Sequence, residues 1–465
     1  MATDAKRLSA RFEPQRFDSF RFVARSIDPQ GGVTLAYALD DAIEFTERLQ
    51  LPVPGRLDER ERARVDGLLA LLHWVAGLSY FKTAAPPRVV CETGAPSPAA
   101  ARLLEALYSE GLGEFAFTNG LPELPRPRFP HAVAGPAGGV SAGEAGDPYP
   151  PSPRRVLVPV GGGKDSIVAQ EVVRRAGVEL ALFSVGDAPP IARTVAVAGL
   201  QRLLARRALD PALARLNGLG ALNGHVPVTA IVACTALLTA TLNGFDAVAM
   251  ANERSASAGN VIWDGVEINH QFSKGMVAER LLASAAAEQL SGGPRPFSVL
   301  RPASELAIAR AFARMERYHG AFTSCNAIFR LDPQLRATSW CCECPKCRFV
   351  FLALAPFSEP EHLRAIFGRD LLADELQFEG FALLTATGGH KPFECVGEEQ
   401  ESLAAIRLLA TDPRWREHVV VRRLVREVLS RQPAGVGDPA EVLALSDEHA
   451  VPPIFLPHLD ALLRS

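Results

Sequence analysis

The sequence predicts an α/β fold built on a parallel sheet, preceded by a smaller α+β domain. Two observations lead to this expectation. Continuous apolar runs at 155–160, 178–187 and 245–253 alternate with helical patterns at 165–177 and 192–209. Strands that are apolar on both faces are typical of a parallel sheet covered by helices on each side. Nearer the N-terminus, apolar and polar residues alternate, as they do in strands with one solvated face.

The N-terminal elements justify the smaller domain. Short strands with this alternation are expected at 20–28, 32–40, 42–51 and 87–94. A helix is expected at 58–79, because apolar residues recur there on one helical face: Val65, Leu68, Leu69, Leu72 and Val75. We therefore assign residues 1–130 to an N-terminal α+β domain whose task the sequence does not reveal.

The composition after residue 130 indicates a linker, a second domain and a C-terminal segment. Residues 131–154 are rich in Gly, Pro and Ala and contain almost no large apolar side chains, so they predict a linker. The parallel-sheet domain is assigned to 155–395, with Gly177 ending its first helix in the C′ position. The apolar stretch 226–242 is interrupted by threonine and too short to span a membrane, which favours a buried helix. Residues 396–465 predict a helical segment.

Composition excludes several classes of protein. The 465 residues are 48% hydrophobic and 22% charged, which is typical of a globular protein with two or three domains. A net charge of −3 gives no reason to expect a nucleic-acid partner. The first twenty residues lack the apolar core of a signal peptide, so we expect a cytoplasmic protein without a membrane partner. The oligomeric state stays open.

A glycine turn follows the strand at 155–160 and reads Gly161-Gly162-Gly163-Lys164-Asp165-Ser166. Glycines let backbone N–H groups approach phosphate oxygens, and the dipole of the following helix favours negative charge there. Asp165 can hold Mg²⁺, and Ser166 can donate to a phosphate. The spacings of the Walker loop and of the dinucleotide fingerprint are both absent. A plain strand-to-helix turn is the alternative interpretation.

The cysteines predict a metal site. Cys341, Cys344 and Cys347 are separated by two C-x₂-C gaps, and Cys325 lies sixteen residues ahead of them. Four thiolates form a tetrahedral zinc site with no open position, which is structural rather than catalytic. Cys342 is the spare thiol. The alternative, a set of reduced buried cysteines, fits poorly beside Glu343, Lys346 and Arg348.

Polar segments at the ends of predicted strands indicate a binding site. They lie at 184–194, 220–230, 250–260 and 266–275. Ligands of open parallel sheets bind at the carboxyl ends of the strands. We therefore predict that four consecutive residues bind substrate: Asn252, Glu253, Arg254 and Ser255. The guanidinium of Arg254 suits a carboxylate or phosphate, although any of these residues taken alone fits an ordinary surface loop.

The glycine turn resembles the PP-loop of the ATP-pyrophosphatase superfamily, whose signature is Ser-Gly-Gly-x-Asp-Ser after the first strand. Gly161 stands where that signature has its first serine. The resemblance implies an adenine nucleotide alpha hydrolase-like fold, cleavage of ATP to an adenylate and pyrophosphate, and Mg²⁺. It also places ATP on residues 161–166 and near Ser184. Together with the cysteine cluster, residues 155–350 resemble the 7-cyano-7-deazaguanine synthases, which activate a carboxylic acid with ATP.

A closer resemblance extends over about 155–400. The segments "PVGGGKDS", "AMANERSASAGN", "NHQFSK", "CPKCRFVF" and "KPFECVGE" are similar to the family of bacterial UDP-N-acetylmuramoyl-L-alanyl-L-glutamate epimerases of the MurL type. The resemblance implies that the substrate is UDP-MurNAc-L-Ala-L-Glu, a peptidoglycan precursor. It implies ATP-dependent inversion of the terminal L-Glu to D-Glu through an acyl-adenylate, with release of AMP and diphosphate.

That reaction is chemically consistent with the motifs. Adenylation removes the carboxylate charge, so a base can take the α-proton and another group can return it on the opposite face. Five residues are candidates for these roles: His225, His270, Lys274, His390 and Cys395. The sequence leaves open which pair acts and whether an oxazolone is formed. Two other functions remain in competition, a ligase of the deazaguanine type and a zinc-stabilised nucleotide-binding module.

Overall fold

The computed structural model describes residues 11–123, 125–131, 152–330, 334, 336–387 and 389–464. Nearly all of the predicted linker at 131–154 lies outside the described residues. The chain folds into two compact units. The first is drawn from 1–148, 203–248 and 277–296, and the second from 149–202, 249–276 and 297–465. The predicted domain boundaries are not tested by this division.

The first unit contains a mostly antiparallel sheet in the order β7-β3-β2-β1-β4. Its strands are β1 (Ser19–Ile27), β2 (Gly32–Leu39), β3 (Ile43–Gln50), β4 (Arg88–Cys91) and β7 (Arg202–Ala208). Neighbouring strands from β7 to β1 run antiparallel, and β4 pairs with β1 in parallel. The four N-terminal strands expected from the sequence are thereby confirmed.

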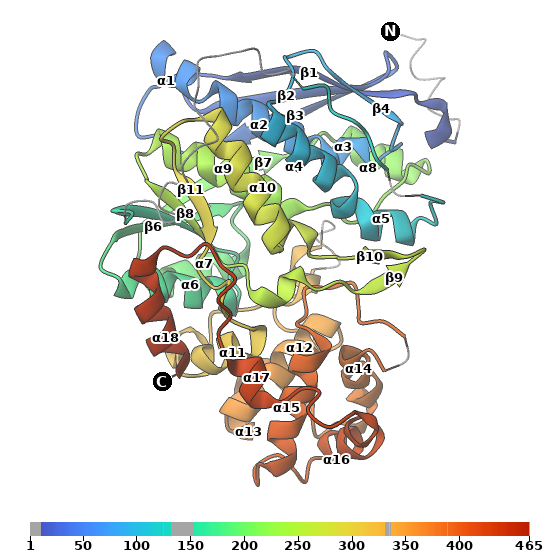
Figure 1. Ribbon diagram of the computed structural model, residues 1–465, viewed down its shortest axis with the longest axis vertical. Coiled ribbons are helices and arrows are strands. Elements are labelled where there is room, and N and C mark those ends of the chain that lie inside the picture. The colour runs from blue at the N-terminus through green and yellow to red at the C-terminus, as the bar shows by residue number, and fades with distance from the viewer. Residues whose placement is uncertain are drawn as a thin grey trace. The chain divides into compact units, whose positions relative to one another are not determined.

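The first unit also contains helices, of which α2 packs on β1 (Figure 1). They are α1 (Glu59–Arg64), α2 (Asp66–Ala76), α3 (Leu78–Phe81), α4 (Pro98–Tyr108), α5 (Gly113–Thr118), α8 (Ala212–Gly218), α9 (Val228–Leu242) and α10 (Met276–Gln289). The helix expected at 58–79 is present as α1 to α3, and Asp58 starts it with a capping box. The expected buried helix is α9, which packs on α2. No helix among the described residues has the length and apolarity to cross a membrane.

An aromatic core fills the space between the sheet and α2 to α4. Phe20 stacks on Tyr37 with ring centroids 5.7 Å apart, and Tyr37 stacks on Tyr80 at 4.9 Å. Phe81 meets Tyr108 edge to face at 4.9 Å. Each such pair contributes about 0.5–1.5 kcal/mol beyond the burial of its area. The alternation along β1 and β2 is therefore explained by one face that is packed with rings.

The helix expected at 192–209 is wrong in its second half. Helix α7 (Pro189–Ala198) ends at Gly199, whose φ of 66° is left-handed and open to glycine at little cost. Residues 202–208 then form β7 and pair with β3. The arginine-rich sequence suits either a helix or a strand. The pairing with β3 selects the strand, because Arg207 binds both carboxylate oxygens of the fully buried Glu47 at 2.6 and 3.0 Å.

Arg207→Met is expected to lower the free energy of unfolding by about 3–5 kcal/mol, because it leaves the Glu47 carboxylate buried without its cation. The double variant Arg207→Met with Glu47→Gln should recover a large part of this loss. Urea unfolding measures both values. A single variant as stable as the parent would contradict the role given to this ion pair.

Four further strands lie in the order β11-β8-β5-β6, with β5 and β6 in the second unit and β8 and β11 divided between the two units. They are β5 (Arg155–Pro159), β6 (Glu179–Val185), β8 (Ala247–Met250) and β11 (Arg295–Ser298), and a separate hairpin comprises β9 (Val261–Trp263) and β10 (Val266–Ile268). β5 and β6 pair in parallel, and so do β8 and β11, because Arg295 donates to Asp246 and Val299 to Met250. The expected α/β class with parallel strands is confirmed.

The helices of the second unit are α6 (Lys164–Arg175), α7, α11 (Glu305–Ala313), α12 (Pro345–Leu354), α13 (Pro360–Phe367), α14 (Phe378–Ala382), α15 (Glu399–Thr411), α16 (Val419–Glu427), α17 (Pro439–Leu443) and α18 (Leu456–Arg464). Gly177 follows α6 with a φ of 72°, which confirms its expected place at C′. α15 packs on α12, α16 and α17 (Figure 1, orange to red). The helical character expected after residue 396 is confirmed.

Candidate active site

The glycine turn joins β5 to α6 within the second unit. Gly163 is the N-cap of α6, so the unpaired N–H groups of the first helical turn begin directly after it. Ser166 donates to the carbonyl of Gly163 at 3.0 Å. Gly161 is exposed and Gly162 is buried. The turn therefore has the local geometry of an anion site, with backbone donors at the start of a twelve-residue helix.

Gly162 is required by its backbone conformation and its neighbours, and Gly163 lies close to one side chain. Gly162 has a φ of 82°, and a Cβ there would lie 2.7 Å from the carbonyl carbon of Pro190. A Cβ on Gly163 would lie 2.7 Å from Oγ of Ser324. Nothing lies within 4 Å of a Cβ on Gly161. The backbone N–H of Thr323 donates to the carbonyl of Gly162 at 3.0 Å, so the segment 323–325 is held against the glycine turn. We call this segment the strap.

Buried charges gather behind the turn. Nζ of Lys164 is fully buried and contacts the carboxylates of Asp165 and Glu305. Nζ of Lys346 lies 3.4 Å from the other oxygen of Glu305. Burial alone would raise the pKa of Glu305, but Lys164 and Lys346 outweigh it and hold this pKa below its usual value. Glu305 is therefore a carboxylate that links the first turn of α6 to α12.

Two further carboxyl groups in this region, those of Glu401 and Glu253, have raised pKa values. Oε1 of Glu401 accepts from the backbone N–H of Glu305 at 2.7 Å and from Oγ of Ser255 at 2.6 Å. Burial raises the pKa of Glu401 to about 7. Burial, with the nearby Glu305, also raises the pKa of Glu253. Both groups can therefore exchange a proton near neutral pH.

Arg301 positions the two segments that carry polar residues. Its side chain is buried, and it donates to the carbonyl of Glu253 at 2.5 Å and to the carbonyl of Lys274. Lys274 ends the short 3₁₀ helix Phe272–Lys274, and its Nζ lies 3.2 Å from Sγ of Cys395. Nε2 of His270 lies 3.8 Å from the same sulfur. We call Lys274, Cys395 and His270 the thiol cluster.

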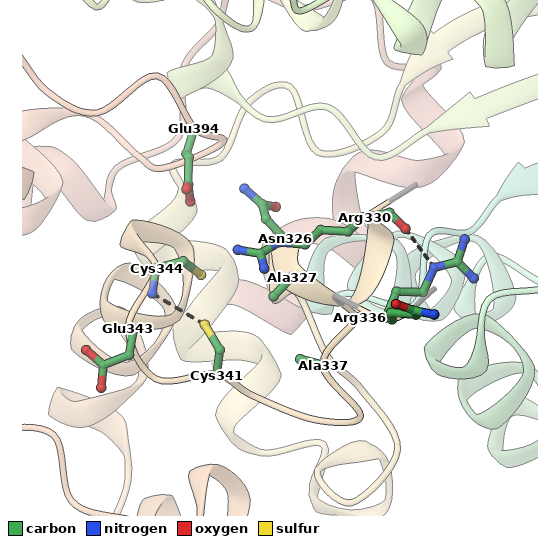
Figure 2. Close-up of a pocket in the computed structure, with 10 residues that line it drawn as sticks. Asn326, Ala327, Arg330, Arg336, Ala337, Cys341, Glu343, Cys344 and Glu394 are labelled. Carbon is green, nitrogen blue, oxygen red and sulfur yellow. Dashed lines mark hydrogen bonds between the residues drawn. The ribbon is translucent and has the colours of Figure 1, made fainter. Parts of the chain in front are cut away.

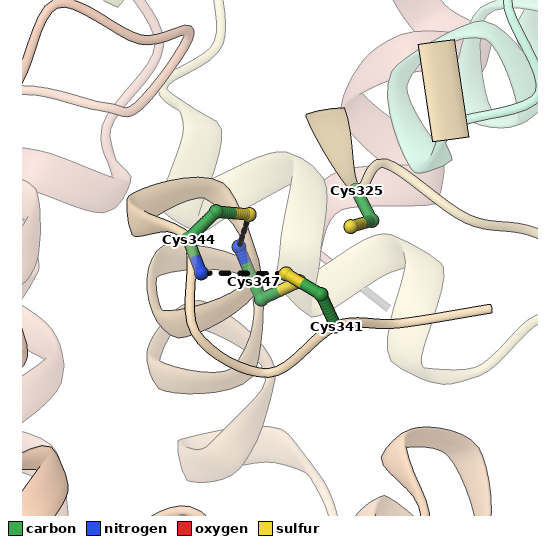
Figure 3. Close-up of side chains that lie close together, drawn as sticks. All are labelled: Cys325, Cys341, Cys344 and Cys347. Carbon is green, nitrogen blue, oxygen red and sulfur yellow. Dashed lines mark hydrogen bonds between the residues drawn. The ribbon is translucent and has the colours of Figure 1, made fainter. Parts of the chain in front are cut away.

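The four predicted zinc ligands come together. Their sulfur atoms all lie within 4.8 Å of one another, and Cys341 and Cys347 are 3.7 Å apart. Figure 3 shows Cys344 and Cys347 at the start of α12, Cys341 on the loop before it, and Cys325 facing them from another segment. The backbone N–H groups of Cys344 and Cys347 point to sulfur at 3.4 Å. The arrangement can hold a tetrahedral metal ion.

A pocket of about 670 Å³ lies against this cysteine cluster. Figure 2 shows Glu394 and Cys344 on one side of it and Arg330 and Arg336 on the other. Its size is that of a small-molecule site. Glu394 accepts from the backbone N–H of Lys346 at 2.9 Å and directly precedes Cys395. The pocket therefore borders both the cysteine cluster and the segment that carries the thiol cluster.

Family models match most of the chain. The MurL N-terminal domain matches residues 11–299, and the MurL C-terminal domain matches residues 321–437. The chain belongs to the MurL family. This confirms the resemblance noted from the sequence at the level of the family.

Relatives of this MurL-family chain carry one name, UDP-N-acetyl-alpha-D-muramoyl-L-alanyl-L-glutamate epimerase. One from a Micromonospora species is 45% identical over 95% of this chain and 97% of its own length. One from Salinispora tropica is 47% identical over 89% of this chain and 90% of its own length. One from Xanthomonas oryzae pv. oryzae is 40% identical over 95% of this chain and 97% of its own length. The chain is thus an isomerase-class enzyme. No solved structure matches it.

The sequence-predicted residues of this MurL-family chain fall in several places. His225 lies in the first unit, with Nδ1 3.9 Å from a carboxylate oxygen of Glu114. His390 is exposed, and its Nδ1 contacts the carbonyl of Lys391 at 2.9 Å. Within the second unit, His270, Lys274 and Cys395 lie together in the thiol cluster. Ser184 lies in β6 and donates to the carbonyl of Gly186 at 3.1 Å.

The predicted substrate residues are mostly engaged with the chain itself. The amide of Asn252 donates to Ser298 at 3.0 Å, and Ser255 donates to Glu401. Arg254 donates to the carbonyls of Val442 and Ala444, both at 3.0 Å. A guanidinium has five N–H donors, so these two bonds leave donors for a ligand. The assignment of these four residues to the substrate stays a prediction.

Sequence reasoning missed three charged residues that the fold brings to the glycine turn: Glu305, Lys346 and Glu401. In the sequence, Lys346 stands out only as a polar neighbour of the cysteines. A weak signal exists for Glu305, because Ser304 is a typical N-cap and begins α11. Nothing in the local pattern of Glu401 points to the turn, since it also serves as the third residue of a helix capping box.

Gly162→Ala is expected to destabilise the protein by about 1–3 kcal/mol, because the left-handed backbone and the clash with Pro190 both oppose a side chain. Gly161→Ser is the matched variant. It adds a hydroxyl in open space and should change the unfolding free energy by no more than about 0.5 kcal/mol. Thermal unfolding compares them, and equal losses would contradict the packing described above.

Proposed function

We propose that this MurL-family chain inverts the terminal L-Glu of UDP-MurNAc-L-Ala-L-Glu to D-Glu in peptidoglycan synthesis. The reaction consumes ATP, passes through an acyl-adenylate and releases AMP and diphosphate. The observation that carries the proposal is the nearly full-length likeness, 40–47% identical, to proteins named for this epimerisation. The reduced cysteines and the use of ATP fit a cytoplasmic reaction.

The proposed ATP site is the glycine turn, taken as a PP-loop. Its residues are Gly161, Gly162, Gly163, Lys164, Asp165 and Ser166, with Ser184 near the adenine. The N–H groups at the start of α6 support phosphate binding there. Ser324, whose hydroxyl lies against Gly163, would substitute for the PP-loop serine that is absent at Gly161. Both the superfamily and this ATP site are part of the proposal.

Asp165 would hold Mg²⁺. Hard carboxylate oxygens are the ligands this ion prefers, and Glu305 brings a further carboxylate to the same region. The ion would neutralise charge on the phosphates of ATP. Lys164 is anchored between Asp165 and Glu305, so it holds the side chain of Asp165 in one orientation at the mouth of the turn.

The adenylate explains why ATP is needed at all. An α-proton next to a carboxylate is very weakly acidic, because its removal would place two negative charges on one small group. Converting the carboxylate to a mixed anhydride with AMP removes the first charge. Proton transfer then needs a base on one face of the α-carbon and an acid on the other. Water releases AMP once the centre is inverted.

Zinc in the cysteine cluster would be structural. Cys325, Cys341, Cys344 and Cys347 would fill all four positions of a tetrahedron and leave none for substrate. Such an ion would fix Cys325 against the start of α12. Because Ser324 and Thr323 precede Cys325 and strap the glycine turn, the cluster would also hold that turn in place. Asn252, Glu253, Arg254 and Ser255 remain the proposed substrate residues.

The test is one incubation in D₂O with Mg-ATP and UDP-MurNAc-L-Ala-L-Glu. The expected products are diphosphate, AMP and a D-Glu epimer carrying deuterium at the α-carbon. Diphosphate that forms only with another carboxylic acid and ammonia would instead indicate a ligase of the deazaguanine type. No cleavage of ATP with any acid would indicate a nucleotide-binding module. Either of these outcomes overturns the proposal.

A further inference from the structure

The thiol cluster is the strongest grouping of a nucleophile with titratable side chains in the described part of the second unit. Lys274 donates to Sγ of Cys395 at 3.2 Å, and its Nζ is also 3.2 Å from Oε1 of Gln271. His270 approaches the sulfur from the same polar segment. Cys395 is half-buried, so it is shielded and still reachable. A cysteine that only packs in a core would need neither a lysine nor a histidine beside it.

These contacts favour the thiolate. Burial would raise the pKa of Cys395, but Lys274 and His270 outweigh it and lower this pKa to about 6. The thiolate and the neighbouring Glu253 in turn outweigh burial at Lys274 and raise its pKa. Lys346 adds a further positive charge from α12. Near neutral pH the cluster is therefore a thiolate–ammonium pair, which is a base ready to accept a proton.

Building on the function proposed above, we propose that Cys395 is one of the two acid–base groups of the epimerisation and that Lys274 is the residue that holds it as a thiolate. Glu253 is the complementary group. The thiolate sulfur takes the α-proton of the acyl-adenylate, and the electron pair of the broken Cα–H bond moves into an enolate. Glu253, as a carboxylic acid, returns a proton to the opposite face. Solvent then restores both groups.

Glu253 has the properties that the second role requires. Its side chain is buried, and among the described residues its Oε1 has no hydrogen-bond partner. An unpaired buried carboxylate is costly, so such a group is retained where a ligand uses it. Arg301 ties the backbone of Glu253 to that of Lys274, so the proposed acid and the residue that holds the thiolate share one frame.

A space of suitable size lies next to the segment that carries Cys395. Glu394, its neighbour in the chain, lines the pocket of about 670 Å³ (Figure 2). Asp165 contributes to the electrostatic environment of both Lys274 and Glu253. The segment that carries Cys395 therefore borders the pocket, and the thiol cluster is coupled by charge to the proposed ATP site. A substrate activated at one end can present its α-carbon to the thiolate.

The decisive variants are Cys395→Ser and Glu253→Gln, assayed in D₂O with each epimer of the substrate. When one group of a two-base pair is lost, exchange of the α-hydrogen stops for one epimer and continues for the other epimer. We expect each variant to lose inversion by about 10²–10⁴-fold. Each should keep α-deuterium exchange with one epimer, and the two variants should keep opposite ones. Substrate-dependent release of diphosphate should persist in both.

A matched control is Cys91→Ser, since Cys91 is also half-buried, lies in the first unit and has a pKa that burial raises. It should retain inversion. Inversion that survives in Cys395→Ser overturns the inference, and so does loss of the same epimer's exchange in both variants. A parent protein that neither releases diphosphate nor exchanges the α-proton would instead overturn the proposed function. The two failures are therefore distinguishable.

Lys274→Met tests the positioning role through a pH profile. Above a thiol's pKa the thiolate is present, so the parent's exchange rate should fall as the pH drops through about 6. In Lys274→Met, the basic groups that remain near the thiol are His270 and Lys346. Lys391 and Glu394 remain as charged neighbours of Cys395 in the chain. The acidic limb should then move toward the ordinary thiol pKa of about 8.5. An unmoved limb would overturn the role of Lys274, even if folding were impaired enough to lower the rate.

Discussion

Cys347→Ala is expected to lower the free energy of unfolding by about 4 kcal/mol or more, with loss of bound zinc. Cys347 is fully buried at the start of α12, and its sulfur lies 3.7 Å from that of Cys341. Structural zinc contributes roughly 10–16 kcal/mol of apparent binding energy in small domains, so loss of one of four ligands is severe. Urea unfolding and metal analysis of the purified protein measure the two effects.

Cys342→Ala is the control, because Cys342 lies next to the cluster in sequence but outside it in space. Its sulfur is 3.3 Å from the carbonyl of Phe367, and it is buried as well. The zinc content should stay unchanged, with a loss of about 1 kcal/mol from packing. Equal losses in the two variants, with no metal in the parent protein, would rule out a structural metal site.

Loss of the metal should also weaken ATP binding. The backbone of Thr323 and the hydroxyl of Ser324 brace the glycine turn, and both precede Cys325 in the chain. Cys347→Ala should therefore raise the KM for ATP more than it lowers kcat for the protein that remains folded. An unchanged KM would show that the strap holds its position without the metal.

Asp165→Ala is expected to reduce substrate-dependent release of diphosphate by about 10³-fold, while the fold is retained. Asp165 lies in the first turn of α6 and is half-buried, and its carboxylate contacts Lys164. Its removal takes away the proposed ligand of Mg²⁺ and frees the ammonium of Lys164 to pair with Glu305 alone. Diphosphate release at several Mg²⁺ concentrations provides the measurement.

Asp460→Asn is the control for this variant. Asp460 lies in α18 of the same unit, outside the proposed site, and forms a half-exposed ion pair with Arg464 at 2.5 Å. Such surface pairs contribute only about 0–1 kcal/mol, so activity and stability should stay close to those of the parent. ATP cleavage that survives in Asp165→Ala would contradict the assignment of Asp165 to the metal.

Local patterns were sufficient for most of the fold. Apolar runs located β5, β6 and β8, and alternation located β1 to β4. The failure at β7 has a physical cause, because "RLLARRA" satisfies a helix or a strand equally well. Its state was decided by β3 and by the buried carboxylate of Glu47, which lies more than 150 residues away in the chain.

The site divides in the same way. Glycines and closely spaced cysteines reveal themselves in sequence, because a positive φ or a tetrahedral set of thiolates imposes a residue type at a set spacing. No such sequence pattern marks the charged residues that surround the glycine turn. Glu305, Lys346 and Glu401 are unremarkable in their own helices, and Cys395 is one of five equal candidates until the fold places Lys274 and His270 beside it.

From sequence alone follow the α/β class, the glycine turn at Gly161–Ser166 that we propose as the ATP site, and the four cysteines that come together in the fold. Each depends on interactions between residues that are near in the chain or confined to one motif. Only the tertiary structure decided that Cys395 is paired with a lysine, that Glu305 joins α6 to α12 and that Ser324 meets Gly163. These contacts join segments more than a hundred residues apart in most cases, and packing of the whole unit sets which charges share one desolvated space.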